Sequence, residues 1–371
     1  EGPRVDASGS DVGTVQIANN AASIIALYRG RIVLSGVAGD PQNWFMSAVG
    51  DPLNWDYFPA TTSATQAVAG NASDAGLLGD VVTALCPYSD DLMVIGCDHT
   101  LWMMRGDPAA GGVIDNVSYQ TGIASPDAWT WDPFGNLWFF GQGTLWKMSM
   151  GGTPEPVSRS RLDRAFQAIN IATNNIRLTW DTLHYGLHIW VTPLLEPSET
   201  ITHYWYDERT DGFWEDAFQS GHGPTAAFVY DADDPNDKAI LLGGFDGYVR
   251  YLDSTISDDD GSAISSYVDI GPLIPAGDQL RTRLLAISAI LDEGSDGATL
   301  SVYASDTAER AKLAGSLRFA RALAAGRSPR IVRRVEGNAL RFRIANSTLG
   351  ESWQMESIEA VFRPVGRQRR T

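Results

Sequence analysis

Hydrophobic residues fall in short runs along most of this chain, and Gly, Asp, Asn or Pro separates one run from the next. Runs that are too short for a helix and lie between turn-forming residues predict β-strands. Five runs look like one strand used repeatedly, because they are apolar without alternation and begin 60, 45, 50 and 53 residues apart. Strands of that kind are covered on both faces. The five runs are Ile32–Leu34, Leu92–Ile95, Leu137–Phe140, Leu187–Val191 and Ile240–Leu242.

A second marker follows some of these runs. Thr100–Met103 and Thr144–Lys147 begin 44 residues apart and share Thr-Leu-Trp, and Gly247–Tyr251 is a looser third copy. A period of about 45 residues with three or four strands per unit is typical of a β-propeller. We therefore predict an all-β chain whose residues 1–262 form an acidic β-propeller of five to six blades. A sixth blade would use Gly13–Ile17 and a strand near Ile264. A two-sheet sandwich is the competing architecture.

The character of the chain changes after residue 262. Several strand-like segments there alternate apolar residues with Arg or Ser, which indicates one packed and one wet face. Residues 263–371 are therefore predicted to form a small, basic, β-sandwich-like domain of antiparallel strands. A short helix is expected after Asp306, capped by Asp306 or Thr307, although Leu317 and Phe319 also fit a strand. The strand-like segments are Leu284–Leu291, Ala298–Tyr303, Ile331–Val332, Leu340–Ile344 and Trp353–Phe362.

Three stretches interrupt the rhythm of strands in residues 1–262. Thr61–Asp80 is small and polar and is expected to be a long loop. Ser160–Ala172 carries apolar residues near helical spacing behind Ser160, which predicts a short helix. Pro193–Thr200 is expected to be a hairpin extension.

The pattern Gly-Asp-Pro-x-Asn-Trp occurs twice, at Gly39–Trp44 and at Gly50–Trp55. Gly, Asp and Pro favour tight turns. We therefore expect Trp44–Val49 to be a strand held between two copies of one turn. Neither copy carries a group suited to catalysis, and both tryptophans are expected to fill gaps between blades.

Charge divides the chain into an acidic body and a basic end. Residues 1–150 carry 5 Lys and Arg against 15 Asp and Glu, residues 151–260 carry 7 against 19, and residues 261–371 carry 16 against 11. An acidic body argues against a surface that holds nucleic acid, because phosphate contacts need Lys and Arg. It permits nucleic acid to pass nearby, since a negative wall repels phosphates. Because no apolar run reaches about 18 residues, no membrane insertion is expected.

No catalytic, cofactor-binding or metal-binding residues are predicted, and the chain is not expected to be an enzyme. It lacks a Gly-x-Ser-x-Gly nucleophile elbow and a phosphate-cradling Gly-rich loop. Ser125–Trp131 comes near a sialidase-type Asp box but lacks its glycine turn. His184 and His188 lie in a strand-like run, where four residues span about 13 Å, too far to share a zinc ion. Cys86 and Cys97 are expected to be buried free thiols rather than a disulfide across a hairpin.

Carboxylates beside aromatic residues suggest an alternative function, a carbohydrate-binding or glycan-cleaving propeller. Sugar-cleaving propellers use acids around a central pocket, and aromatic rings stack on sugars. The acidic turns within Asp231–Asp237 and at Asp258–Asp260 offer oxygen ligands for calcium, but they lack EF-hand spacing and are expected to be solvated turns. The candidate acids for sugar chemistry are Asp181, Asp207, Glu208, Glu215 and Asp216.

Arg29–Ser35 followed by Ser47–Phe58 resembles structural proteins of tailed bacteriophages, in particular the β-propeller tail tubular, or nozzle, proteins of short-tailed phages. Those proteins commonly carry an Arg-x-Arg strand and then a Ser-x-x-Gly turn that leads to Asn and an aromatic residue. Gly350–Glu359 also looks like their closing strands. Familiar nozzle proteins are longer, so a related tail hub or side attachment also fits the resemblance.

The resemblance implies a virion protein of the phage tail, made in the host cytoplasm, and a specific set of partners. The chain would form a homo-oligomeric ring, with six copies the expected number, through which DNA is ejected without specific binding. Its other partners would be adjacent tail or adaptor proteins, and the basic end of the chain could dock an acidic neighbour.

Overall fold

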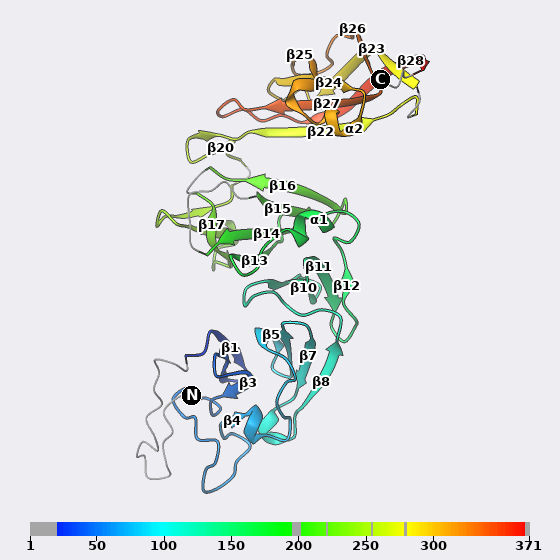
Figure 1. Cartoon of the computed structure of the whole chain (residues 1–371). Helices are drawn as coiled ribbons and strands as arrows, with labels where there is room; N and C mark the ends of the chain where they lie inside the picture. The colour runs from blue at the N-terminus through cyan, green and yellow to red at the C-terminus, as the bar shows by residue number, and fades with distance from the viewer. Residues whose placement is uncertain (1–20, 195–201, 220–221, 254, 278–279, 368–371) are drawn as a thin grey trace. The chain divides into compact units, whose positions relative to one another are not determined.

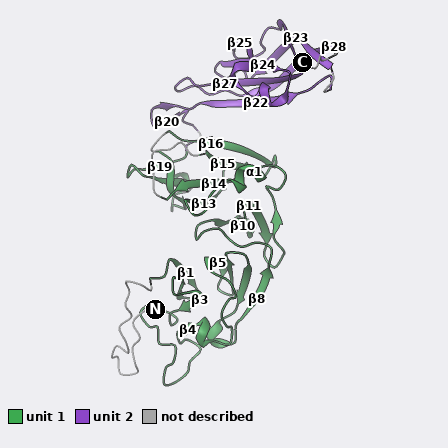
Figure 2. Cartoon of the chain, in the orientation of Figure 1, with its two compact units in different colours: residues 1–252 green, residues 253–371 purple. Residues whose placement is uncertain are grey.

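The computed structural model shows an all-β chain, as the sequence predicts (Figure 1). The residues that it describes are 21–194, 202–219, 222–253, 255–277 and 280–367. The chain divides into two compact units, Glu1–Leu252 and Asp253–Thr371 (Figure 2). This division precedes the expected boundary at residue 262, because the hairpin of β20 (Asp258–Asp259) and β21 (Ser262–Ala263) falls in the second unit.

The described residues of unit 1 form five antiparallel sheets that follow one another along the chain, each a meander of consecutive strands. The first sheet is β1 (Ile24–Tyr28), β2 (Arg31–Val37), β3 (Asp40–Met46) and β4 (Val68–Ala69). The second is β5 (Val82–Ser89), β6 (Leu92–Cys97), β7 (Leu101–Arg105) and β8 (Val113–Ser118). The third is β9 (Trp129–Trp131), β10 (Asn136–Gly141), β11 (Thr144–Ser149) and β12 (Glu155–Pro156). The fourth is β13 (Asn174–Asp181), β14 (Gly186–Pro193), β15 (Thr202–Asp207) and β16 (Gly212–Ala217), and the fifth is β17 (Pro224–Tyr230), β18 (Ala239–Gly244) and β19 (Val249–Tyr251).

The five apolar runs found in the sequence lie in the second strands of the five sheets, β2, β6, β10, β14 and β18. The two Thr-Leu-Trp copies lie in or at the start of the third strands β7 and β11, and the looser copy overlaps β19. The prediction of one strand used five times is therefore confirmed.

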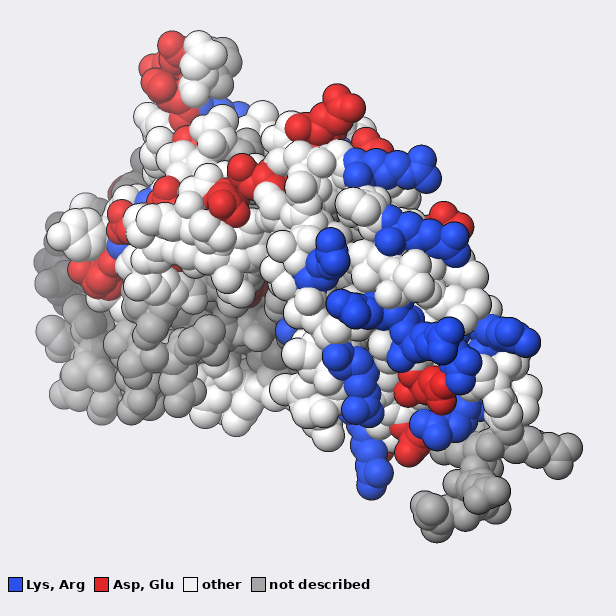
Figure 3. Space-filling model, turned by 90° about the horizontal axis from the view of Figure 1, so that it is seen from above, with Lys and Arg blue, Asp and Glu red and all other residues white. Residues whose placement is uncertain are grey.

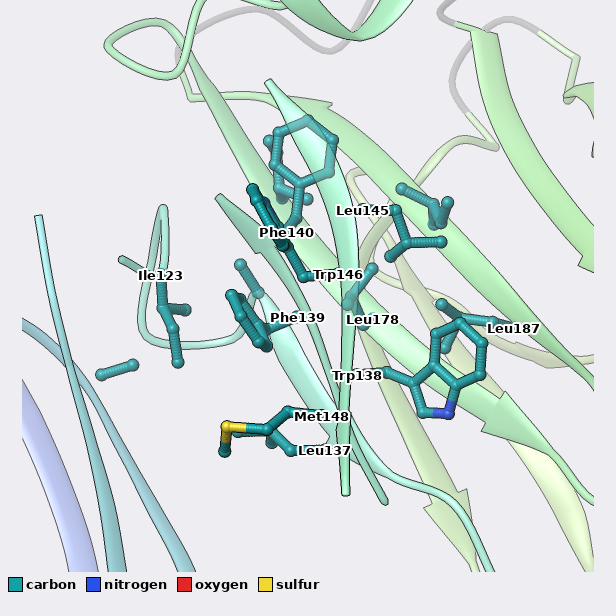
Figure 4. Packing of buried hydrophobic residues seen from close by; sticks show 14 of the residues in the cluster. Ile123, Leu137, Trp138, Phe139, Phe140, Leu145, Trp146, Met148, Leu178 and Leu187 are labelled. Carbon is teal, nitrogen blue, oxygen red and sulfur yellow. The ribbon is translucent and has the colours of Figure 1, made fainter. Parts of the chain in front are cut away.

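Strand β10 explains why these second strands are apolar without alternation. Phe139 points to the side of its sheet where Ile123 lies, whereas Trp138 points to the other side, toward Leu187 of the fourth sheet (Figure 4). On that side the ring centroids of Trp138 and Trp180 are 5.7 Å apart. Because neighbouring structure covers both faces, no polar alternation remains in the strand.

Buried clusters join each sheet of unit 1 to the next. One cluster contains side chains of the first and second sheets, a second spans the second, third and fourth, and a third joins Trp190 of the fourth to Ile240 and Leu242 of the fifth. First strands also contact one another across sheets: β1 contacts β5, β9 contacts β13, and β13 contacts β17. The sheets therefore pack face to face in sequence order.

The two Gly-Asp-Pro-x-Asn-Trp copies adopt different structures, so the prediction of one turn used twice is wrong. In the first copy Asp40–Trp44 already belong to β3, and the turn lies at residues 38–39. The second copy is a tight turn in which Gly50 has a φ of 69° and Asp51 accepts a hydrogen bond from the Leu53 amide. Pairing with β2 extends from the first residue of β3 and so includes the first copy in the sheet.

Both tryptophans of this pattern are buried, but only one lies between sheets. Trp44 is fully buried in the cluster shared by the first and second sheets, as predicted. Trp55 packs with Phe45 and Tyr57 on the face of the first sheet that points away from the second. Its indole N–H donates to the carbonyl of Pro52 over 2.9 Å. The second copy therefore folds its tryptophan back onto its own sheet.

Arg31, in the Arg-x-Arg segment, is a fully buried cation. Its guanidinium donates to the carbonyls of Ser47 (2.9 Å), Gln66 (2.5 Å) and Ala64 (2.9 Å) and to the carboxylate of Asp107 (3.0 Å). A charge is tolerated in the interior only when it is paired and hydrogen-bonded. Arg31 thereby joins β2 to the loop before β4 and to the segment that follows β7.

The expected loop Thr61–Asp80 is mostly irregular, but it contains the short strand β4 and a 3₁₀ turn. The helix expected behind Ser160 is α1, which is only Asp163–Gln167. Ser160 does not cap it; the Ser160 amide instead donates to Asp163 Oδ2 over 2.9 Å. Among the described residues of unit 1, 3₁₀ turns occur at Gly70–Ala72, Pro108–Ala110 and Pro235–Asp237.

Two further expectations concern the cysteines and the sixth blade. Cys86 and Cys97 are both buried free thiols, as expected. Gly13–Ile17, the first half of a sixth blade, lies outside the described residues, as does most of the expected hairpin extension after Pro193. Ile264 is exposed and belongs to no strand.

Besides the β20–β21 hairpin, the described part of unit 2 contains two larger antiparallel sheets that share one buried core. The expected helix is α2 (Ala308–Ala311), where Thr307 accepts the capping hydrogen bond from the Arg310 amide (3.2 Å), and Leu317 begins a strand instead of extending the helix. One sheet is β22 (Ser266–Leu273), β27 (Ala339–Asn346), β24 (Ala298–Ser305) and β25 (Leu317–Leu323), and the other is β26 (Ile331–Gly337), β23 (Leu280–Leu291) and β28 (Met355–Arg367). The 3₁₀ turn Ala314–Ser316 precedes β25.

Replacing Trp55 by Ala should destabilise unit 1 by about 3–5 kcal/mol, because it empties the space that a large buried ring fills. Leu53→Ala is the matched control in the same turn, since Leu53 is 74% exposed. It should cost less than about 0.5 kcal/mol. Urea unfolding followed by circular dichroism measures both changes. A loss below about 1 kcal/mol for Trp55→Ala would contradict the packing described for this ring.

Replacing Arg31 by Met should cost about 3–5 kcal/mol, because it removes a fully buried guanidinium that donates to three backbone carbonyls and to the carboxylate of Asp107. Arg105→Met is the control, since the Arg105 side chain is 53% exposed and pairs with Asp115 at the surface, apart from Asp107. That substitution should cost about 1 kcal/mol or less. The same urea titration measures both variants, and equal losses would show that Arg31 does not join the segments.

Candidate functional site

Two of the candidate acids lie at one end of the fourth sheet. Asp181 is the last residue of β13 and Asp207 is the last residue of β15, and each is paired in register with Gly186 of β14. They are therefore two strand spacings apart, or about 10 Å between backbones. The structure therefore brings these two residues to the same end of the sheet, as a sugar-cleaving site would require.

Asp181 is already used to hold a hairpin turn. Its Oδ1 accepts hydrogen bonds from the amides of Leu183 (2.8 Å) and His184 (3.0 Å), and its Oδ2 lies 2.7 Å from His184 Nδ1. Burial by itself would raise the pKa of Asp181, but the ring of His188 and the hydrogen bonds of His184 outweigh burial and hold that pKa well below its ordinary value. A carboxylate held this way stays ionised and cannot donate a proton near neutral pH.

Asp207 has the same role in the hairpin of β15 and β16. It accepts hydrogen bonds from the Arg209 amide (2.9 Å) and from the Thr210 hydroxyl (3.1 Å). Asp132 does so in the third sheet, where the amides of Phe134 (2.9 Å) and Asn136 (2.8 Å) donate to it. The sequence signal for this role is an Asp at the end of an apolar run, followed within five residues by Gly. It marks turns rather than catalysis.

The remaining candidate acids do not join this pair. Glu208 forms an ion pair with Lys147 of the third sheet (2.5 Å), and Glu215 is exposed on β16. Burial raises the pKa of Asp216, which the nearby His188 partly offsets. Asp216 lies four residues along β16 from the residue paired with Asp207, or about 13 Å by strand rise. Asp216, the candidate acid whose pKa burial raises, therefore does not lie at the end of the sheet where Asp181 and Asp207 lie.

His184 and His188 are closer together than expected, so the predicted separation of 13 Å is wrong. The hairpin turn begins after Asp181, and His184 lies in that turn rather than in a strand. His184 Nδ1 is 2.7 Å and His188 Nε2 is 3.6 Å from the same oxygen, Oδ2 of Asp181. The turn at Tyr185, whose φ is 59°, reverses the chain between the two histidines.

The His188 ring is held by aromatic stacking. It stacks on the Trp190 ring at 4.8 Å with an interplanar angle of 11°, and its centroid is 4.5 Å from that of Trp205. Both ring nitrogens are buried and have no hydrogen-bond partner among the described residues. A histidine next to an aspartate is the arrangement of a general base, but it needs a nucleophile within hydrogen-bond reach. No nucleophilic side chain among the described residues lies within hydrogen-bond reach of the His188 ring.

His203 is a second buried histidine of the fourth sheet. Its Nδ1 accepts a hydrogen bond from the Val191 amide over 3.1 Å, and its ring meets those of Trp190 and Phe218 edge to face. Burial lowers the pKa of His203 to about 4. The ring is therefore a neutral packing element at ordinary pH.

The acidic turns close on themselves. Asp231 pairs with Lys238 (2.6 Å), Asp234 accepts a hydrogen bond from the Asn236 amide, and Asp258 accepts one from the Gly261 amide. Across the described ranges, no group of three or more His, Cys, Asp or Glu residues is placed to hold a metal ion. The carboxylates of these turns therefore bind groups of their own turn, either backbone amides or the side chain of Lys238.

The fifth sheet exposes an apolar face. Cross-strand pairing places Phe228 opposite Leu241 and Leu241 opposite Tyr251, so the three side chains lie side by side. The other face of this sheet carries Ile240 and Leu242 and packs on the fourth sheet. We call the exposed set the last-sheet face: Phe228 (66% exposed), Tyr230 (45%), Leu241, Val249 (69%) and Tyr251 (60%).

The first sheet exposes an apolar face at the opposite end of the series. Ile25 pairs with Leu34 and Leu27 pairs with Ile32, so these four residues share the face that points away from the second sheet. Trp55 and its cluster cover part of that face, but Ile25 remains 69% exposed and Leu27 64%. We call Ile25, Leu27, Ile32 and Leu34 the first-sheet face.

Unit 2 carries an exposed run of cations. Eight of the 25 residues from 310 to 334 are Lys or Arg, and none is acidic. They lie mostly on and between the edge strands β25 and β26, and none forms an ion pair with another described residue. Figure 3 shows Lys and Arg side chains gathered on one side of the view, with few acidic ones among them. The eight are Arg310, Lys312, Arg318, Arg321, Arg327, Arg330, Arg333 and Arg334, all exposed.

In the part of the chain that the structure describes, no helix has the length and apolar character needed to cross a membrane. No family model matches the chain, and neither does any curated protein.

Several solved structures are weakly similar. The N-terminal domain of Nup159 aligns over 63% of this chain and 60% of its own length, with 8% identity and a TM-score of 0.39. The dihydro-heme d1 dehydrogenase NirN aligns over 88% and 71%, with 9% identity and a TM-score of 0.36. PorZ, a surface component of the type-IX secretion system of Porphyromonas gingivalis, aligns over 97% and 48%, with 10% identity and a TM-score of 0.38. Similarity at this level carries no argument about this chain.

Stability should fall as the pH drops from about 6.5 to about 4, because His203 is buried in its neutral form. The unfolded chain takes up a proton near pH 6.5 and the folded chain only near pH 4, so protonation favours unfolding in this interval. Keeping the His203 ring neutral contributes on the order of 3 kcal/mol to the free energy of unfolding. This contribution is complete above about pH 6.5 and is lost as the pH falls toward about 4. Urea unfolding at several pH values in this range measures the free energy of unfolding, which should fall less steeply with decreasing pH in His203→Gln than in the wild type. Equal slopes would contradict the neutral buried state.

Proposed function

We propose that this chain is a structural, non-enzymatic component of a bacteriophage tail that assembles as a homo-oligomeric ring around the path of DNA ejection. Unit 1 would be the β-propeller part of that component, with its successive sheets as blades. Unit 2 would be the part that docks neighbouring tail proteins. The resemblance of Arg29–Ser35 and Ser47–Phe58 to phage nozzle proteins suggests the tail.

The observation that carries a structural role is the pair of uncovered apolar faces at the two ends of unit 1. The last-sheet face and the first-sheet face expose large side chains such as Phe228 and Leu27. Patches of this kind on folded proteins mark surfaces that bind other macromolecules. A chain that acts alone gains nothing from such patches, whereas a ring subunit needs them.

The residues that carry the phage resemblance also have structural roles here. Arg31 joins three segments of unit 1, and Trp55 covers part of the first sheet. Neither residue is placed to bind a small ligand. This is the behaviour expected of a scaffold pattern rather than of a binding motif.

Charge supports the same proposal. Residues 1–252 carry 12 Lys and Arg against 30 Asp and Glu, so a channel lined by this unit would repel DNA and let it slide. The exposed cations between Arg310 and Arg334 suit an acidic surface on a neighbouring tail protein. The glycan-cleaving alternative has no comparable support, because Asp181 and Asp207 are occupied in turns.

The proposal predicts that this chain is present in purified phage particles and that the purified protein forms rings. Mass spectrometry of gradient-purified virions tests the first expectation, and negative-stain electron microscopy of the purified chain tests the second. Absence from virions would refute the tail assignment even if rings form. Presence in virions without rings would replace the ring by a side attachment on the tail.

A further inference from the structure

We propose that the last-sheet face of one copy packs against the first-sheet face of the next copy, so that the series of sheets continues from chain to chain. This inference rests on the proposed function in one respect, since it names how the subunits of the proposed ring contact one another. The interface is heterologous, because two different surfaces of the same chain meet.

The contact would continue a type of junction that unit 1 already uses four times. Within the chain, the second, third and fourth sheets each pack one face on the preceding sheet and the other on the following sheet. At three of the four junctions first strands contact first strands, as β13 contacts β17. The most exposed aliphatic residues of the first-sheet face, Ile25 and Leu27, lie in first strand β1. Phe228 and Tyr230 of the last-sheet face lie in first strand β17. The two surfaces left over are therefore the two halves of one more such junction.

The chemistry of the two faces is complementary. The last-sheet face is rich in rings, with Phe228, Tyr230 and Tyr251, whereas the first-sheet face is aliphatic. The fourth and fifth sheets meet in the same way, where Trp190 packs on Ile240 and Leu242. Exposed aromatic residues at these fractions present roughly 100–150 Å² each, so the last-sheet face reaches several hundred Å². That is the size at which exposed apolar patches mark interaction sites.

A symmetric pairing of two copies covers only one of the two exposed apolar faces of each copy. If last-sheet face met last-sheet face, the dimer would still expose Ile25 and Leu27 of both copies. A head-to-tail contact covers both faces of every copy once a ring closes. A second copy is therefore the occupant that satisfies both ends with one interface.

The test uses two full-length variants, each with one face blocked. Leu27→Arg blocks the first-sheet face and Phe228→Arg blocks the last-sheet face; both residues are exposed, so the fold should be retained. Light scattering after size-exclusion chromatography should find oligomers for the wild type and monomers for each variant alone. An equimolar mixture should give a dimer and nothing larger, because only one unblocked interface can form between the two variants. Leu183→Arg, at a residue 71% exposed in the turn after β13, is the control and should assemble like the wild type.

Three outcomes would overturn the inference. A wild type that stays monomeric at all concentrations would mean that the two faces are covered within one chain, by each other or by unit 2. Variants that assemble like the wild type would place the subunit interface elsewhere, and the tail assignment, which virion composition tests separately, would be unaffected. A mixture that stays monomeric would exclude the head-to-tail pairing. Circular dichroism and thermal midpoints equal to those of the wild type confirm that each variant is folded.

Discussion

A β-sheet with two apolar faces is stable only when both faces are covered, and unit 1 is built to meet this constraint. The second strand of each sheet, such as β10, is apolar on both sides, so every sheet needs a neighbour before it and a neighbour after it. Inside the series that need is met by the chain itself. The first and last sheets each have a neighbouring sheet on one face only, so side chains on the other face, such as Leu27 and Phe228, are exposed. The rule that builds the fold therefore also produces the surfaces on which the proposed assembly depends.

The two ends of the series solve this problem to different degrees. At the first sheet, the turn that carries Trp55 folds over part of the free face, and Arg31 holds the following loop in place through three carbonyls and Asp107. At the last sheet, only three strands are present and no comparable segment lies over Tyr251 among the described residues. Arg31 and the turn that carries Trp55 thus form a partial cap, and the described chain provides such a cap at one end only; Arg29 and Gly30 of the expected Arg-x-Arg strand instead form the turn before β2.

The sequence was most informative where burial on both faces leaves a continuous apolar run, as at Leu92–Ile95, because a run this short and this apolar suits a strand covered on both sides. It was least informative where a turn decides the geometry. The distance between His184 and His188 was predicted wrongly, since the prediction requires both to lie in one strand, whereas the strand ends at Asp181 and the chain reverses before Gly186. The two-residue strand β4 has no periodicity to detect. Of the acids beside aromatic residues, Asp181 and Asp207 lie at strand ends, where an Asp followed within five residues by Gly marks the turn that uses the carboxylate.

The neighbour-only packing of unit 1 also bears on how cooperatively the protein unfolds. Because each sheet contacts only the sheets beside it, stability is close to a sum of sheet terms and junction terms, as in repeat proteins. The fifth sheet has three described strands and one junction, built around Trp190, so we expect it to open at a lower free energy than the sheets that lie between two neighbours. A partner on its free face would add the missing junction and couple that sheet to the rest of the array. Folding and assembly would then be linked equilibria, and the chain would become more stable as its own concentration rises.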